Sequence, residues 1–207
     1  INQLWFSYFN QTRFNNKWEL WTDLNLRTKD NFVDKLSVSI VRFGLSYYLA
    51  DNTKITAGYA WANFFSADNH KSSSRTEHRP WQQILWKTNY GKKTMMQTIR
   101  LEERFREKIL NDSFVKGGYN FNFKLRYNIL LEIPLGKKIR VPGSFSFIVS
   151  DDIHFNFGKE IVFNYFDQNR FYLGLKYQVG PATNIQMGYL NIFQQLPAAN
   201  RYVQNNA

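Results

Sequence analysis

The chain has 207 residues, 27 Lys and Arg against 16 Asp and Glu, a formal net charge of +11, and no cysteine. Its 19 Phe, 12 Tyr and 6 Trp exclude an intrinsically disordered chain, and the lack of cysteine excludes a disulfide scaffold or a cysteine-ligated metal centre. No segment has the roughly 20 consecutive apolar residues that a membrane-spanning helix needs. The length predicts a single domain over residues 1–207.

Alternation of apolar and polar residues predicts ten β-strands and no helix. In chain order the strands are expected at residues 3–13, 18–28, 35–49, 54–65, 80–90, 93–106, 119–133, 144–157, 169–179 and 184–195. The clearest alternation runs from Tyr119 to Ile133, with Leu130 as its one exception. At roughly 3.4 Å per residue this strand is about 50 Å long, whereas strands of globular domains mostly have about 5–6 residues. A phase slip near Ile40 and Val41 predicts a β-bulge in the third strand.

Tight turns and longer polar loops alternate between these strands. The longer loops are expected around residues 29–34, 66–79, 107–118 and 158–168, and long loops on one rim are typical of outer-membrane barrels. Residues 1 and 195 would then both lie on the long-loop rim, so either a strand is missing from an end of the chain or the long loops face inward. The tail 196–207 is expected to lack a strand. The five prolines are expected outside the alternating cores of the strands: Pro80, Pro134, Pro142, Pro181 and Pro197.

These patterns predict an all-β fold, an antiparallel transmembrane β-barrel of at least ten strands (10–12) with a polar lumen. A ring of this width is too wide to be filled by one apolar layer, so we expect the apolar face to contact lipid. Four glycines are expected on the inner face: Gly44, Gly58, Gly174 and Gly188. Aromatic residues near strand ends match interfacial girdles: Trp5, Phe6, Tyr8, Tyr47, Tyr48, Trp61, Phe64, Phe65, Trp81, Trp86, Phe163, Tyr165 and Phe166. The alternative left open is a soluble lipocalin-like barrel, which buries its apolar face.

Charged residues on the polar faces of adjacent strands are the main site candidates. The predicted polar network of the lumen comprises Arg100, Glu102, Arg104, Lys124, Arg126, Asp152, His154 and Arg170. One interpretation is a salt-bridged plug that satisfies buried polar groups. The other is an anion-selective path, because the bases of this network outnumber its acids.

Two further groups of residues have the chemistry of a reactive or metal site. Ser150, Asp152 and His154 share one strand face, as a hydrolase relay requires, but side chains two apart along a strand are roughly 7 Å apart, so no direct hydrogen bond is expected. His70 and His78 match no metal-binding spacing, so neither a metal nor a cofactor is expected.

The basic segment 70–75 offers cations for lipopolysaccharide phosphates. The positive charges lie opposite the aromatic faces, which argues against nucleic acid as a partner.

Six short strings are shared with a known family. They are FNQTRF (9–14), LRTKD (26–30), EHRPWQQ (77–83), RLEERF (100–105), NYFDQNR (164–170) and FQQLP (193–197). The chain resembles a family of short exported proteins from Bacteroides-related Gram-negative bacteria, classed as a domain of unknown function and thought to form an outer-membrane β-barrel. Members usually continue past the last string into a final aromatic strand, which this chain lacks. The resemblance implies a location and a fold, but no reaction, substrate or catalytic residue.

Together these observations predict an integral outer-membrane β-barrel that is not an enzyme. We expect a structural or accessory subunit of a larger outer-membrane complex. Its partners would be outer-membrane lipids, lipopolysaccharide and other outer-membrane proteins. The alternatives left open are a narrow anion-preferring channel and an outer-membrane lipid hydrolase.

Overall fold

The computed structural model describes residues 3–29, 35–65, 74–110, 113–197 and 201–207 and consists of one antiparallel sheet of eleven strands. The strands are β1 (Trp5–Arg13), β2 (Trp18–Lys29), β3 (Lys35–Ala50), β4 (Thr53–Phe64), β5 (Arg75–Tyr90), β6 (Lys93–Leu110), β7 (Ser113–Leu135), β8 (Phe145–Phe157), β9 (Phe166–Gln178), β10 (Asn184–Gln195) and β11 (Tyr202–Asn206). Each strand pairs with its neighbours in the sequence, so the sheet is a simple meander. In the described part of the chain no helix is long and apolar enough to cross a membrane.

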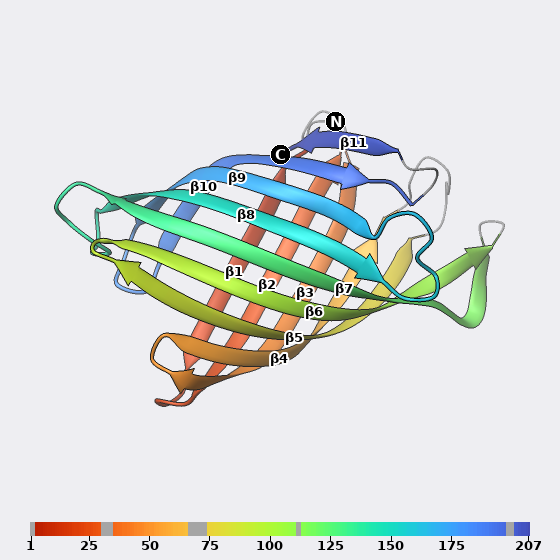
Figure 1. Ribbon diagram of the computed structural model, residues 1–207, viewed down its shortest axis with the longest axis horizontal. Helices are drawn as coiled ribbons and strands as arrows, with labels where there is room; N and C mark the ends of the chain where they lie inside the picture. The colour runs from red at the N-terminus through yellow and green to blue at the C-terminus, as the bar shows by residue number, and fades with distance from the viewer. Residues whose placement is uncertain (1–2, 30–34, 66–73, 111–112, 198–200) are drawn as a thin grey trace.

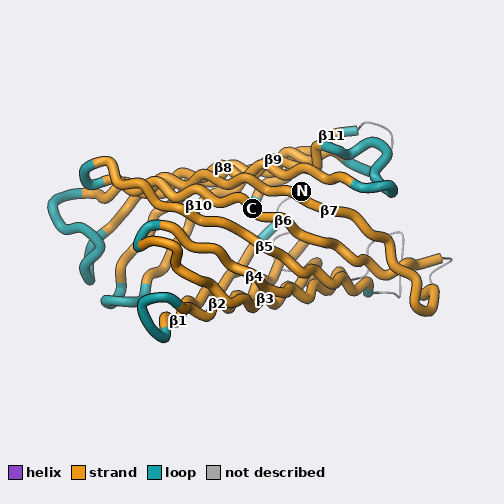
Figure 2. The backbone as a smooth tube through the Cα atoms, turned by 60° about the horizontal axis from the view of Figure 1, so that its bottom comes forward, coloured by secondary structure: helices purple, strands orange, loops and turns teal. Residues whose placement is uncertain are grey.

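The sheet curls into a half-barrel, so that β1–β3 pass behind β6–β9 at a steep angle (Figure 1). Turns and loops gather at the two ends of the strands (Figure 2). The two edge strands approach each other where the Gln3 backbone N–H donates a hydrogen bond of 3.1 Å to the Asn206 carbonyl. The curl therefore separates an inner face from an outer face.

All ten predicted strands are present, but the sequence analysis missed several extensions. The tail contains β11, which pairs with the end of β10 through Gln195 and Tyr202, so the prediction of a strand-free tail is wrong. The loop expected at 107–118 is also wrong, because β6 runs to Leu110 and β7 begins at Ser113. Likewise, β5 begins at Arg75, inside the loop expected at 66–79. Pairing with a long neighbour extends these strands beyond the segments whose own alternation is regular.

Two prolines lie inside strands, contrary to the prediction. Pro80 pairs with Tyr59 of β4. On the β6 side the paired residues go from His78 to Trp81, so Pro80 lies at a gap in that ladder. Because proline has no N–H to donate, the ladder tolerates it at such an interruption. Pro134 pairs with Ser146 close to the end of β7.

The predicted bulge at Ile40 and Val41 is wrong, since the β2–β3 register is continuous there and shifts instead between Arg27 and Thr28. The apparent phase slip has another cause. Ile40 points inward and is 1% exposed, whereas Val41 is outward and 44% exposed. An apolar residue on the inner face therefore looks, in the sequence, like a shift in the alternation of apolar and polar residues.

The outer face of the sheet is apolar and the inner face is polar. On β3 the outward Phe43 is 54% exposed, whereas the inward Arg42 and Ser46 are 9% and 0% exposed. The same inversion holds along the sheet, where large apolar side chains are exposed and charged side chains are buried. The lipocalin-like alternative, which requires a buried apolar face, is therefore wrong.

One small apolar cluster lies on the inner face. It comprises Val38, Ile40, Ala60, Ala62 and Trp81, with Trp21 and Phe64 packed against it. Trp81 is 1% exposed and covers the paired Gly44 and Gly58, because a Cβ built at Gly58 would lie 2.6 Å from the indole of Trp81. The glycines thus make room for this ring, and Trp81 does not belong to an outer girdle as predicted.

Candidate functional site

The inner face carries a charged network that spans β5–β9. The register places Glu102 opposite Lys124, Arg126 opposite His154, and Asp152 opposite Arg170. Because inward residues recur at every second position of each strand, neighbouring strands bring these side chains together. Six of the eight predicted network residues are buried: Arg100, Glu102, Arg104, Lys124, Asp152 and His154. Arg126 and Arg170 are half-buried.

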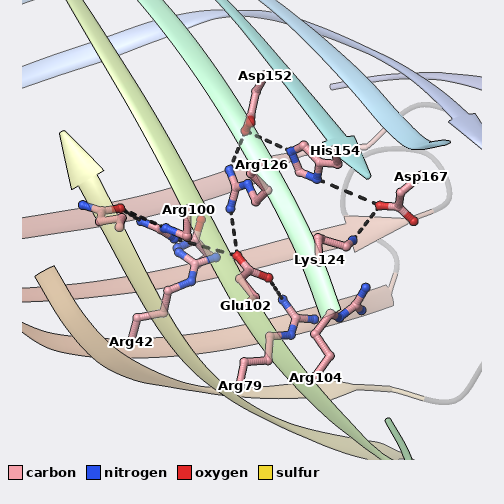
Figure 3. Close-up of polar contacts among 12 residues, drawn as sticks. Arg42, Arg79, Arg100, Glu102, Arg104, Lys124, Arg126, Asp152, His154 and Asp167 are labelled. Carbon is pink, nitrogen blue, oxygen red and sulfur yellow. Dashed lines mark hydrogen bonds and ion pairs between the residues drawn. The ribbon is translucent and has the colours of Figure 1, made fainter. Parts of the chain in front are cut away.

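A chain of ion pairs, continued by contacts of the His154 ring, links four of these strands (Figure 3). The Glu102 carboxylate lies 3.2 Å from Arg126, which also holds Asp152. His154 Nε2 lies 3.0 Å from the Asp152 carboxylate, and the other ring nitrogen lies 3.9 Å from Asp167. Lys124 closes the chain at 2.6 Å from Asp167. Desolvation of such groups is costly, and their mutual pairing offsets that cost.

A second group of ion pairs is centred on Glu77 of β5. Its fully buried carboxylate accepts paired hydrogen bonds from Arg79 and from Arg104. Arg79 also reaches Glu102 at 4.0 Å and so joins the two groups. The sequence analysis missed Glu77 and Arg79 because it assigned residues 66–79 to a loop. The signal was present in the alternation of Glu77, Arg79 and Trp81, which the neighbouring Pro80 obscured.

The contacts between side chains two apart on one strand correct another expectation. No direct hydrogen bond was expected between Asp152 and His154; their polar atoms nevertheless come within 3.0 Å, although His154 Nε2 makes no hydrogen bond. Arg79, two residues from Glu77 on β5, does donate a hydrogen bond of 2.9 Å to the Glu77 carboxylate. Long side chains lean along the strand direction, so the backbone spacing does not limit the distance between their tips.

The structure does not assemble a serine–histidine pair. The Ser150 hydroxyl accepts a hydrogen bond of 2.9 Å from the Asn128 amide. His154 instead contacts Asp152, and its Nδ1 lies 3.1 Å from the Gln168 amide. A nucleophile needs a base within hydrogen-bond reach, and the contacts of His154 with Asp152 and Gln168 do not involve Ser150.

The histidine pair considered for metal binding is not brought together in the described residues. His78 lies in β5, where its Nδ1 contacts the Tyr59 hydroxyl, whereas His70 and residues 71–73 lie outside the described residues. Within the described ranges, no group of three or more His, Cys, Asp or Glu side chains is arranged to hold a metal ion.

Two cavities lie on either side of the network. The first has a volume of about 300 Å³ and is lined by residues next to the longer connections, among them Arg75, Arg106 and Asn164. The second has a volume of about 910 Å³ and is lined near the tight turns, by Asn52 and Lys87 among others. Five side chains line both cavities and form the wall between them: Trp5, Arg27, Arg42, Arg126 and Arg170.

Interactions across the interior hold this wall together. Over the Trp5 ring of β1 lie Arg27, at 3.8 Å from the ring centroid, and Arg170 of β9, at 5.0 Å. Outside the wall, Arg100 of β6 makes a similar contact at 5.5 Å from the Trp21 ring of β2. Arg–aromatic contacts of this kind stabilise a cation without a carboxylate. Trp5 therefore belongs to the interior, and its prediction as a girdle residue is wrong.

One protein family matches this sequence. The family described as "Protein of unknown function (DUF2490)" matches residues 2–203. No curated protein and no solved structure matches the chain. The predicted resemblance to a domain-of-unknown-function family is confirmed at this level, and the bacterial origin and outer-membrane location stay predictions.

Proposed function

The chain belongs to a family of proteins of unknown function (DUF2490), and from its geometry we propose that it is an integral outer-membrane β-barrel. Its interior is filled by ion pairs, and it serves as a structural or accessory subunit of a larger envelope complex rather than as an enzyme. Outer-membrane lipids and lipopolysaccharide surround it, and other outer-membrane proteins are its partners.

The inverted polarity of the sheet is the observation that carries this proposal. Val41, Phe43 and Leu45 follow one another on the outer face of β3 and are each at least 44% exposed. Apolar surface of this kind extends over most strands, whereas soluble monomers rarely expose large contiguous apolar patches. Lipid is the solvent in which such a surface is favourable, and membrane-spanning sheets place their polar residues inside.

The outer face also has two aromatic bands. The band near the longer connections contains Phe105, Phe121, Phe123, Phe155, Phe157, Phe166, Phe193 and Tyr202. The band near the tight turns contains Trp18, Tyr47, Phe145 and Tyr177. On β9, Phe166 and Tyr177 are eleven positions apart, which at roughly 3.4 Å per residue and a tilt of about 45° spans about 26 Å. That height matches the ~25 Å apolar band of membrane barrels.

An edge of the sheet supports the accessory role. In the described sheet one edge of β1 pairs with β2. Near its other edge a backbone hydrogen bond joins Gln3, which precedes β1, to Asn206 of β11. Unpaired N–H and C=O groups along a strand are a template for a strand from another chain. A partner barrel or lipoprotein with a free strand would satisfy them.

Site-specific labelling tests the proposal directly, because the chain has no native cysteine. Phe43→Cys places a thiol on the outer face of β3, and Asn16→Cys places one in the exposed turn between β1 and β2. With the protein refolded into lipid vesicles, a water-soluble maleimide should label Asn16→Cys and leave Phe43→Cys unlabelled. Equal, rapid labelling of both variants would show that the apolar face is not in lipid and would overturn the proposal.

A narrow anion-preferring channel is the second candidate. The two cavities share the wall side chains, four of which are arginines: Arg27, Arg42, Arg126 and Arg170. A small rearrangement of this wall would join the cavities. The surplus of guanidinium groups would favour anions over cations in such a path.

A further inference from the structure

The interior holds more cations than its carboxylates can neutralise. Every buried carboxylate among the described residues has a cation within 4.0 Å: Glu19, Asp23, Glu77, Glu102, Glu132, Asp152 and Asp167. The described interior arginines without such a partner are Arg27, Arg75, Arg106 and Arg170. All four line the same cavity of about 300 Å³.

The remaining contacts of these four arginines leave their charge uncompensated. The Nε atom of each is buried and has no hydrogen-bond partner. Arg27 and Arg170 lie over the Trp5 ring, Arg75 lies 5.5 Å from the Phe64 ring, and Arg106 donates to the amide oxygen of Asn122 at 2.7 Å. Aromatic rings and an amide carry no negative charge, and a buried charge without a counter-charge is costly.

We propose that this cavity is a binding site for a phosphate-type oxyanion held by Arg27, Arg75, Arg106 and Arg170. Guanidinium groups present paired N–H donors that match the oxygens of phosphate. The volume of about 300 Å³ exceeds that of a bare phosphate group and admits a pyrophosphate or a small organic phosphate.

The other cations around the cavity do not take part in the same way. Arg104 is held by Glu77, Lys124 by Asp167, and Arg126 by Glu102 and Asp152. They raise the positive potential of the cavity but already have counter-charges. The site therefore consists of the four uncompensated arginines, and it stands independently of whether the sheet is embedded in a membrane.

Calorimetric titration of the full chain in a neutral detergent, with pyrophosphate as the probe, tests the site. We expect saturable binding that persists at about 0.15 M chloride. Arg170→Gln or Arg27→Gln should weaken the affinity about tenfold or more. Arg13→Gln, which removes an exposed arginine from the far end of β1, should leave the affinity unchanged. Equal affinity in all variants, or no binding to the native chain, would overturn the proposal.

Thermal unfolding gives a second readout that does not depend on detecting heat of binding. Without phosphate, Arg170→Gln should unfold at a higher temperature than the native chain, because it removes an unpaired charge from a positive cavity. Pyrophosphate should raise the unfolding temperature of the native chain and of Arg13→Gln more than that of Arg170→Gln. The proposal would be overturned if pyrophosphate left the unfolding temperature of the native chain unchanged, or if it stabilised Arg170→Gln as much as the native chain. Either result would mean that water alone solvates these arginines.

Two probes distinguish the possible sources of the phosphate. Pyrophosphate represents a free ligand, and monomeric dihexanoyl phosphatidic acid represents a lipid headgroup. Tighter binding of the lipid would assign the site to a headgroup, and tighter binding of pyrophosphate would assign it to a soluble phosphate. Since the labelling experiment reports only on the outer face, this site and membrane insertion succeed or fail separately.

Discussion

Glu102 has the most contacts with arginine of any single carboxylate described in the interior. It lies 3.2 Å from Arg126 and 4.0 Å from both Arg79 and Arg100, and it is 4% exposed. Three guanidinium groups from β5, β6 and β7 therefore share this acid; Arg79 also pairs with Glu77 and Arg126 with Asp152, whereas Glu102 is the one carboxylate within 4.0 Å of Arg100 among the described residues. The adjacent Glu103 points to the opposite face, where its carboxylate meets the Gln82 amide at 3.4 Å.

Replacing Glu102 should be far more damaging than replacing its neighbour. Glu102→Gln leaves the buried Arg100 without its counter-charge, a change that typically costs about 3–5 kcal/mol. Glu103→Gln should change the free energy of unfolding by less than about 0.5 kcal/mol, as is usual for surface positions. Urea titration followed by tryptophan fluorescence measures both. Equal stabilities of the two variants would show that the ion pairs of Glu102 contribute little.

At the scale of the strands, pairing is uneven across the sheet. The central β7 pairs with β6 and β8 along most of its length, whereas β11 has five residues and pairs with β10 alone. The Asn206 side chain strengthens this short pairing, since its oxygen accepts hydrogen bonds from Tyr189 and Asn191 at 2.7 and 3.0 Å. Local opening is easiest where paired backbone and packed neighbours are few.

Hydrogen exchange should therefore be faster in β11 than in β7. Asn206→Ala should lower the free energy of local opening of β11 by about 1 kcal/mol, because it removes hydrogen bonds that each contribute modestly. Asn10→Ala, on the exposed edge of β1, should leave exchange in β11 unchanged. Mass spectrometry of peptides from the exchanged 207-residue chain measures these rates. Slow exchange of β11, at the rate of β7, would contradict the prediction.

At the scale of the whole molecule, the wall between the cavities decides whether the interior conducts. Trp5 and the guanidinium groups beside it separate the cavity at the loop end from the cavity at the turn end. Arg27 and Arg170 both lie over the indole, at 3.8 and 5.0 Å from its ring centroid. Trp5 is the one apolar side chain among the five that form the wall.

Planar bilayer recordings separate a channel from a plugged barrel. If the path is a channel, the native chain should conduct weakly with chloride preferred over potassium, and Trp5→Ala should conduct severalfold better because the wall has lost its indole. Trp61→Ala, which changes a side chain on the outer face that is 51% exposed, should conduct like the native chain. Silent recordings from the native chain and Trp5→Ala would exclude the channel and favour the accessory role, and a preference for potassium would contradict the role of the arginines.

Residue patterns alone were enough to predict the class of fold, the approximate positions of ten strands and the polar character of one face. These properties follow from a period of two, which is local to each strand and needs no partner. The same rule identified Glu102, Arg126, Asp152 and His154 as residues of the polar face. It also left Ile40 as an apparent irregularity, because alternation alone does not reveal an apolar residue that faces inward.

The tertiary structure alone decided which residues meet. Register between strands places Glu102 beside Arg126 and Asp167 beside Lys124, and curvature brings Trp5 of β1 to Arg170 of β9. Pairing with longer neighbours extends β6 and β7, creates β11 and accommodates Pro80 at a gap in one ladder. Such contacts join residues far apart in the chain, so they depend on how the sheet pairs and curls rather than on any local pattern of residues.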